Sequence, residues 1–318
     1  MTDARRLGAT DLATPPLILG GNVFGWTADE RTSFAILDTF VAGGGRMIDT
    51  ADSYSAWLPG HRGGESETII GAWLRKRGLR DDVLIATKVG GEMGGTRGLA
   101  PERILRSADD SLRRLGIETI DLYFAHFDDP ETPLGDTLAA FDRLVRDGKV
   151  RAIGASNYDA ARLAEALDIS AASGLASYAV LQPHYNLLER PGFEGALRDL
   201  CLERNVAAVP YFGLASGFLT GKYRRPEDLV GTARGGAVGR YMTDHGLRVL
   251  AAVDRAAAEM RATPAQVALA WLAAQPAVAA PIASATSVPQ LEELLGASRL
   301  ELPPHQLALL DAASRAPA

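Results

Sequence analysis

Cysteine is nearly absent from this chain of 318 residues: Cys201 is the only one, so no disulfide can form within the chain. A cysteine-rich zinc site is excluded for the same reason. The five histidines show no metal-ligand spacing, and we expect no metal site. A single cysteine fits a reducing compartment, and we expect the protein to be cytoplasmic.

Long apolar runs and charge of one sign are also missing. No stretch of about 18 apolar residues is present, so no membrane-spanning helix is expected, and the polar segment 1–10 does not resemble a signal peptide. The net charge of −6, without a basic tail, argues against nucleic acid and anionic membranes as partners. What remains is the composition of a soluble globular protein, 47% hydrophobic and 23% charged.

Short apolar runs alternate with longer amphipathic segments along the chain. Several of the runs are almost continuously hydrophobic, which is typical of strands covered on both faces. We predict eight strands, at Leu17–Gly21, Arg46–Thr50, Val83–Val89, Ile120–His126, Val150–Asn157, Ala179–Tyr185, Ala207–Phe212 and Ala277–Ala283.

The segments between the runs carry helix signals. Pro101 can open a helix, because a proline at the first helical position sacrifices no hydrogen bond. Three capping boxes predict further helix starts, at Thr27–Glu30, Thr263–Gln266 and Ser287–Gln290.

This alternation predicts an α/β protein with parallel strands and right-handed crossovers. Even spacing, with no linker at the midpoint and no G-x-G-x-x-G after the first strand, favours a closed (β/α)8 TIM barrel over an open doubly wound sheet. We expect one domain over residues 1–318, with the active site at the C-terminal face of the strands. The long connection at about 214–245 is rich in glycine and arginine, and we predict that it forms a loop over that site.

Four polar residues lie at or just after the ends of three consecutive predicted strands: Asp49, Tyr54, Lys88 and His126. Such ends converge on one mouth in a barrel, so these side chains are expected to meet. Tyr54 can donate a proton to a carbonyl oxygen if the ammonium of Lys88 lowers its pKa, with Asp49 holding Lys88. His126 can orient the carbonyl and donate a hydrogen bond to its oxygen. No residue supplies a hydride, so a cofactor is required.

A second pattern indicates where such a cofactor binds. The last predicted strand runs into the Ser287 capping box, and the free N–H groups of a helix start can hold an anion. Tyr211 can stack on a flat ring, and Ser156, Asn157 and Gln182 can hydrogen-bond a carboxamide. For the substrate pocket we nominate the aromatic residues Trp26, Trp57, Phe127 and Tyr185.

The residues from Asp49 to Tyr54 read D-T-A-D-S-Y and resemble the D-T-A-x-x-Y signature of the aldo-keto reductases. Five further segments resemble family landmarks in the same order, so the resemblance covers nearly the whole chain. They are Ile85–Lys88, Asp121–His126, Gly148–Asn157, Leu181–Asn186 and Gly217–Tyr223.

This resemblance implies a barrel that binds NADP(H) without metal and reduces an aldehyde or ketone reversibly. It implies a catalytic tetrad of Asp49, Tyr54, Lys88 and His126, with Tyr54 as the general acid. The implied cofactor contacts are Gly21, Asn22, Ser156, Asn157, Gln182, Tyr211, Phe212, Gly213, Leu214, Ala215, Gly217, Ser284, Thr286, Gln290 and Glu293.

The chain departs from the family where the 2′-phosphate of the cofactor is held. Many members carry lysine or arginine at the positions of Ser284, Thr286 and Gln290. Hydroxyl groups replace such cations weakly. The helix N-terminus after the last strand still favours an anion, so NADP(H) remains the expected cofactor, with NAD(H) as the alternative.

Two other readings stay open at this point. A Schiff-base aldolase would also use a lysine on a barrel strand, here Lys88. A non-catalytic nicotinamide-nucleotide sensor is the other, with the related potassium-channel β-subunits as precedent. The partner expected in solution is a small carbonyl compound; its identity and the oligomeric state are not encoded in any motif we can interpret.

Overall fold

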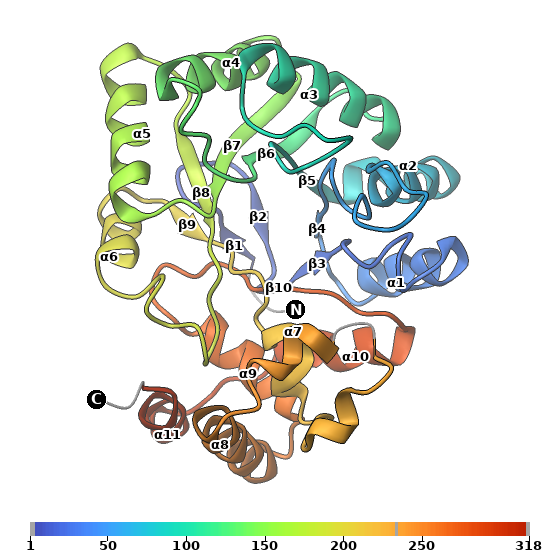
Figure 1. The fold of residues 1–318 in the computed structure, drawn as a ribbon, viewed down its shortest axis with the longest axis vertical. Coiled ribbons are helices and arrows are strands. Elements are labelled where there is room, and N and C mark those ends of the chain that lie inside the picture. Colours follow the sequence, from blue (N-terminus) through green and yellow to red (C-terminus); the bar gives the residue numbers. More distant parts are fainter. Residues whose placement is uncertain (1–3, 233–234, 316–318) are drawn as a thin grey trace.

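The computed structural model describes residues 4–232 and 235–315. Its centre is a sheet of eight parallel strands in the order β10-β3-β4-β5-β6-β7-β8-β9. Hydrogen bonds from Ala208 N to Ala277 O, from Ala279 N to Ala208 O and from Ile282 N to Pro210 O join the two outer strands. The sheet therefore closes on itself, and the predicted (β/α)8 barrel is confirmed (Figure 1).

The strands of the barrel follow the predicted runs, but each strand is shorter than its run. In the last three runs a proline lies in the part that is not strand: Pro183 follows β8, Pro210 lies just beyond β9, and Pro281 directly precedes β10. Proline cannot donate a hydrogen bond to a neighbouring strand. The strands are β3 (Ile18–Gly20), β4 (Met47–Asp49), β5 (Leu84–Val89), β6 (Ile120–Ala125), β7 (Val150–Ser156), β8 (Tyr178–Gln182), β9 (Ala207–Ala208) and β10 (Ile282–Ala283).

The helices form a ring around the barrel (Figure 1), and α8 and α11 pack on each other. Their bounds are α1 (Glu30–Ala42), α2 (Glu65–Arg77), α3 (Pro101–Leu115), α4 (Leu134–Arg146), α5 (Ala160–Ser173), α6 (Ala196–Glu203), α7 (Gly235–Gly239), α8 (Asp244–Met260), α9 (Pro264–Ala273), α10 (Val288–Ala297) and α11 (Pro304–Ser314), with short 3₁₀ turns η1 (Arg80–Asp82), η2 (Ala215–Thr220) and η3 (Pro226–Leu229). No helix in these ranges is long and apolar enough to cross a membrane.

The observed helix starts show which of the three predicted capping boxes form. The Thr263 box is confirmed, since Thr263 and Gln266 each cap the other's backbone N–H. The Thr27 box is wrong: Asp29 caps α1, and its carboxylate accepts from Thr32 N at 2.8 Å. Ser287 caps α10, but Gln290 Oε1 accepts from Thr286 N rather than from the cap.

A hairpin that the sequence did not reveal covers the N-terminal end of the barrel. Its strands, β1 (Arg5–Arg6) and β2 (Ala13–Thr14), are antiparallel. Leu7 and Leu12, between them, belong to the same buried cluster as barrel residues such as Met47. The hairpin therefore closes the end of the barrel opposite the strand C-termini.

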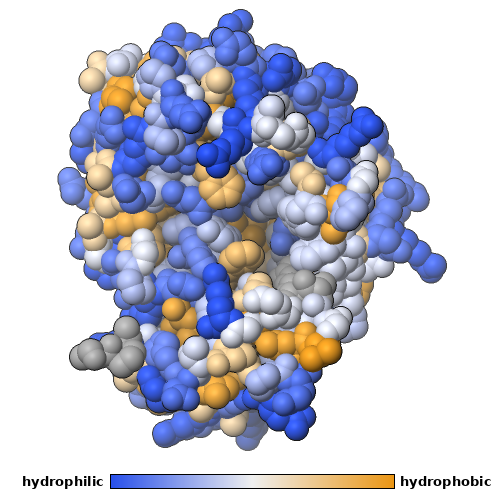
Figure 2. All heavy atoms as spheres, in the orientation of Figure 1, coloured by the Kyte–Doolittle hydropathy of each residue, from blue (hydrophilic) through white to orange (hydrophobic). Residues whose placement is uncertain are grey.

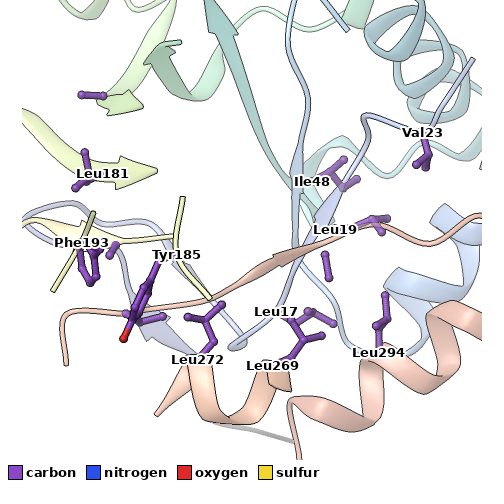
Figure 3. Packing of buried hydrophobic residues seen from close by; sticks show 14 of the residues in the cluster. Leu17, Leu19, Val23, Ile48, Leu181, Tyr185, Phe193, Leu269, Leu272 and Leu294 are labelled. Atoms are coloured by element: carbon purple, nitrogen blue, oxygen red, sulfur yellow. The ribbon is translucent and has the colours of Figure 1, made fainter. Parts of the chain in front are cut away.

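The larger core lies between the sheet and the helices. Figure 3 shows Leu19 and Ile48 from the strands near Leu269 and Leu294 from the helices, all within one buried cluster. Tyr185 belongs to this core, with its ring centroid 4.9 Å from that of Phe193 and 5.6 Å from that of Trp271. Its hydroxyl donates to Glu194, so the prediction that Tyr185 lines the substrate pocket is wrong.

Candidate active site

A cavity of about 1430 Å³ opens at the C-terminal ends of the strands. Figure 2 shows a hollow near the middle of the visible face, with apolar side chains around it. Residues from all eight barrel strands or the loops that follow them line this cavity, from Gly20 at the end of β3 to Leu294 on α10. The cavity is large enough to hold a ligand larger than a simple aldehyde.

Three of the four predicted catalytic side chains form one hydrogen-bonded group. Lys88 Nζ donates to Asp49 Oδ2 at 2.7 Å, to Tyr54 Oη at 2.8 Å and to the carbonyl oxygen of Thr50 at 2.8 Å. Lys88 is fully buried, so all three donor positions of its ammonium are used within the protein. Asp49 and Tyr54 line the cavity, whereas Lys88 lies behind them.

His126 completes the group on the neighbouring strand end. Its ring lies 6.1 Å from the Tyr54 ring, edge to face, and stacks on Phe127 at 4.5 Å. Its Nδ1 is buried without a hydrogen-bond partner among the described residues. Burial and the charge of Lys88 hold the pKa of His126 well below its usual range. The imidazole is therefore neutral at physiological pH and can donate one hydrogen bond.

The pKa of Tyr54 departs from the expectation. Burial and the Asp49 carboxylate raise this pKa well above 10, and do not lower it as predicted from Lys88 alone. Burial lowers the pKa of Lys88, and Asp49 opposes that effect. Tyr54 thus keeps its proton at neutral pH, while Lys88 Nζ lies where it can stabilise the phenolate that forms once the proton leaves.

The predicted carboxamide contacts are linked to the catalytic group. Gln182 Nε2 donates to Asp49 Oδ1 at 2.9 Å. Asn157 Nδ2 donates to the His126 carbonyl at 2.9 Å, and its Oδ1 accepts from Tyr211 Oη at 2.6 Å. Ser156 donates to the Gln182 carbonyl at 2.9 Å. These residues line the cavity, and their mutual bonds fix the position of the Tyr211 ring.

The turn after β9 has an unusual backbone. Phe212, Ala215, Ser216 and Gly217 all have positive φ angles, of 55°, 48°, 59° and 104°. Non-glycine residues adopt this conformation at a cost of the order of 1 kcal/mol each, and such strain clusters at functional sites. Phe212, Gly213, Leu214 and Gly217 line the cavity as predicted, whereas Ala215 is buried behind its neighbour Ser216, which does line it.

The far end of the cavity is built by the turn into α10. Ser284, Thr286, Gln290 and Glu293 line it, and Ser284 Oγ donates to Asn22 Oδ1 at 2.5 Å. Gln290 Oε1 accepts from both the amide and the hydroxyl of Thr286. No arginine or lysine from this turn lines the cavity, and Glu293 adds a carboxylate. Gly21, predicted as a contact, lies beside the wall; its neighbours Gly20 and Asn22 line it.

The predicted aromatic residues divide into two kinds. Trp57 and Phe127 line the cavity with side chains about half exposed, at 52% and 48%. Trp26 is not part of the wall; it contacts Trp57 edge to face at 5.6 Å and supports it from behind.

The predicted loop at about 214–245 covers the site only in its first third. Residues of η2 and the stretch to Tyr223 line the cavity, but the described residues beyond Tyr223 do not. Residues 233–234 of this loop lie outside the described ranges. The later part forms η3 and α7 instead, which the run of glycines had concealed.

Sequence reasoning missed several polar residues of the wall. His61 and Arg62 follow Trp57 in a glycine-rich loop, and Lys222 and Thr220 belong to the segment that resembles a family landmark. These loop positions show no periodicity in the sequence that could have identified them. Lys222 could still have been predicted from its place in that landmark. Within the described ranges, no group of histidine, cysteine, aspartate and glutamate could hold a metal ion.

Comparison with known proteins agrees with this geometry. The profile of the Aldo/keto reductase family matches residues 16–315. Aldo-keto reductase str7 of Strobilurus tenacellus is 33% identical over 285 residues, 88% of this chain and 80% of that protein. Aldo-keto reductase yakc of Schizosaccharomyces pombe, whose name specifies NADP(+), is 32% identical over 283 residues, 86% and 80% of the two chains. A putative voltage-gated potassium channel subunit beta of the same yeast is 33% identical over 257 residues, 77% and 73%.

Proposed function

The chain belongs to the aldo/keto reductase family and is a nicotinamide-dependent oxidoreductase; on that premise we propose that it reduces an aldehyde or ketone with NADPH, with Tyr54 as the proton donor. The observation that carries the proposal is the group formed by Lys88, Asp49 and Tyr54, in which one ammonium lies 2.7 Å from the carboxylate and 2.8 Å from the phenol. A buried phenol held against a cation is suited to give up its proton only when a strong base develops beside it.

Each of the four tetrad residues has a separate role in this reaction. When bound, the nicotinamide supplies a hydride to the carbonyl carbon. Tyr54 donates its proton to the carbonyl oxygen, and Lys88 stabilises the phenolate left behind. His126, neutral and adjacent, directs the carbonyl oxygen toward Tyr54 by a hydrogen bond. Asp49 keeps Lys88 charged and in place.

The residues present fit a nicotinamide nucleotide along the cavity. Tyr211 stacks on His184 with a centroid distance of 5.2 Å, which leaves its other face for a flat ring. Ser156, Asn157 and Gln182 surround that position with amide and hydroxyl groups. The strained turn at 212–217 and the Ser287-capped start of α10 offer backbone amides for the phosphates.

The preference between NADPH and NADH rests on the far end of the cavity. The N-terminus of α10 and the hydroxyls of Ser284 and Thr286 favour an anion there, and Glu293 opposes it. We therefore propose NADPH as the cofactor and expect the selectivity against NADH to be modest.

A regulatory role is the second candidate, because two relatives carry the name of potassium channel subunits. The intact tetrad geometry favours catalysis over a sensor without turnover. The aldolase reading is weakened by Lys88 itself: its Nζ is buried, bound to three oxygens and absent from the cavity wall, whereas a Schiff-base lysine must reach the substrate.

Two further parts of the proposal concern the whole chain. We propose that residues 1–318 form one domain, since a single apolar cluster includes residues from Leu17 to Leu310. We also propose a cytoplasmic location, since the only cysteine, Cys201, is buried and its thiol is free.

The experiment is a paired titration of the protein with NADPH and with NADH, followed by tryptophan fluorescence, and then turnover of 4-nitrobenzaldehyde. We expect binding of both nucleotides, tighter for NADPH, and turnover that depends on Tyr54. Binding without turnover of any aldehyde or ketone would favour the sensor. Binding of neither nucleotide would contradict the proposal.

A further inference from the structure

A buried carboxylate lies behind the tetrad and has no part in the chemistry proposed above. The side chain of Asp52 is fully buried, and neither of its carboxylate oxygens has a hydrogen-bond partner among the described residues. Its backbone N–H donates to the carbonyl oxygen of Lys88 at 3.2 Å. Asp52 does not line the cavity. It can therefore influence the reaction only through the residues around it. Lys88 is the member of the tetrad to which this backbone hydrogen bond joins it.

Two neighbouring side chains share this lack of partners. Arg103, on α3, donates from Nη2 to the Gly91 carbonyl at 2.7 Å, but its Nη1 is buried and unpartnered within the described ranges. The same holds for the hydroxyl of Tyr123 on β6. Buried polar groups in proteins are nearly always hydrogen-bonded, either to protein atoms or to ordered water. The charge of Arg103 acts on Asp52, and both charges act on Tyr123, so the three groups lie in one buried polar region.

A second buried carboxylate nearby differs in its pairing. Glu67, on α2, accepts from Arg114 Nε and from Thr87 Oγ1, both at 2.6 Å. Its charge is therefore compensated within its own ion pair. Asp52 has no ion pair in the described part of the chain, so its charge acts on Lys88 without such compensation.

Burial and the surrounding charges act in opposite directions on the pKa of Lys88. Burial lowers the pKa of Lys88, and the charges of Asp49, Asp52 and Glu67 raise it. Burial raises the pKa of Asp52 to about 7; Glu67 adds to this, and Arg103 and Arg114 oppose it. The titratable and charged groups that face this region are Asp49, Asp52 and Tyr54 after β4, Glu67 on α2, Arg103 and Arg114 on α3, and Tyr123 and His126 from β6 and its end.

We propose that Asp52 is a positioning residue for the reduction: its buried carboxylate, which has no ion pair of its own, keeps Lys88 charged under alkaline conditions. This inference rests on the proposed function, because it acts through the role of Lys88 in that reaction. Asp52, the second aspartate of the D-T-A-D-S-Y segment, thus has a role separate from that of Asp49.

The direct test measures the titration of the Lys88 ammonium itself. The chain has four lysines, Lys76, Lys88, Lys149 and Lys222, so protein labelled with ¹⁵N-lysine gives few signals, and the Lys88 signal is identified by its loss in Lys88→Arg. In Asp52→Asn we expect the titration midpoint of Lys88 to fall by about one pH unit, which is a roughly tenfold weaker hold on the proton. Asp52→Ser removes the same charge with a smaller side chain, and Asp52→Glu restores it. An unchanged midpoint in both neutral variants would overturn the proposal.

The second readout is the pH profile of kcat for NADPH with 4-nitrobenzaldehyde. The alkaline limb should move to lower pH in Asp52→Asn by the same amount, with KM near that of the wild type. Asp142→Asn is the matched control, because Asp142 is a buried carboxylate on α4 that accepts from Ala176 N at 2.8 Å, remote from the tetrad. A purely structural role would lower kcat and the Tm without moving the limb, and that result contradicts the proposal. If the wild type reduces no carbonyl compound at all, the proposed function fails, while the Lys88 titration still decides the role of Asp52.

Discussion

The two ends of the cavity are built in opposite ways. At the tetrad, the hydrogen bonds of Lys88 and Asp49 reach other strands or loops: Lys88 binds Asp49 and Tyr54, and Asp49 binds Gln182. At the α10 end, the polar side chains mostly bind their own neighbours, as Gln290 binds Thr286. Among the described residues, Ser284 links that turn to another element through its bond to Asn22, and Gln266 on α9 donates to the Glu293 carbonyl.

This difference separates reactivity from recognition. Proton transfer requires donor and acceptor to be held within a few tenths of an ångström, and in this chain contacts between strands of the closed barrel provide that. A phosphate can be held by a helix start and a few hydroxyls from one local segment. The tetrad should therefore tolerate no substitution without loss of rate, whereas the α10 turn should be open to change without loss of the fold.

The largest expected effect is at the tetrad end. Tyr54→Phe removes the proton donor and leaves the ring, so we expect kcat to fall by about 10²–10⁴-fold. The Kd for NADPH should stay within about twofold, since the hydroxyl contributes to chemistry and not to cofactor binding. Steady-state kinetics and fluorescence titration measure the two quantities. Tyr241→Phe, outside the cavity, is the control; near-wild-type kcat in Tyr54→Phe would show that the proton comes from another group.

A change at the α10 end should strengthen binding without touching the rate. Thr286→Arg places a guanidinium where we expect the 2′-phosphate, and we predict a Kd for NADPH lower by about 10–100-fold, as one charge-assisted hydrogen bond contributes about 1.5–3 kcal/mol. The Kd for NADH should not fall. Thr286→Gln separates the effect of length from that of charge. If both nucleotides gain equally, the phosphate lies elsewhere.

A smaller effect is expected at the aromatic rim beside the tetrad, where the ring centroid of Trp57 lies 6.3 Å from that of Tyr54. Trp57→Ala should raise KM for 4-nitrobenzaldehyde by about 3–10-fold, since about 1 kcal/mol is typical of a ring contact that remains partly exposed to solvent. KM for propanal should change less, because a short aliphatic chain does not reach the rim. Equal changes for both aldehydes would place Trp57 away from the substrate.

The smallest expected effect is that of pH near neutrality. The pKa of Tyr54 lies well above 10 and that of His126 well below its usual range, so neither group changes its charge between about pH 6.5 and 8.5. Tyr54 loses its proton only as the pH rises far above this window, and His126 gains one only as the pH falls below it. We expect kcat for reduction to vary by less than about twofold there. A steep titration within the window that persists in Asp52→Asn, whose wild-type carboxyl has a pKa of about 7, would assign the proton donor to a different group.

The barrel and the tetrad were predictable because each left a strong signal. Alternating apolar runs determine parallel strands, and strand ends bring Asp49, Lys88 and His126 together in any closed barrel. The Thr263 capping box and the proline at the start of α3 were readable for the same reason: each depends on neighbours in sequence.

What the sequence did not reveal depends on distant neighbours. Tyr185 and Phe127 are both aromatic residues near strand ends, yet one is buried against Trp271 and the other is exposed in the cavity. The direction of the shift in the pKa of Tyr54 depends on how burial and the Asp49 charge combine, which no spacing encodes. Asp52 looked like a spacer within a motif, since its missing partners are visible only once α3 and β6 are packed around it.

The hydrogen bond from Gln182 to Asp49 joins residues 133 apart in sequence. Gln182 ends β8 and Asp49 ends β4, which are opposite one another in the cyclic order of the eight strands. A partly assembled barrel, with its last strands still unattached, would present Tyr54 and Lys88 beside an incorrectly anchored carboxylate. Recovery of turnover after dilution from denaturant should therefore coincide with ring closure and lag behind secondary structure. Immature copies of the enzyme, which lack the bond that orients the catalytic carboxylate, should therefore be inactive.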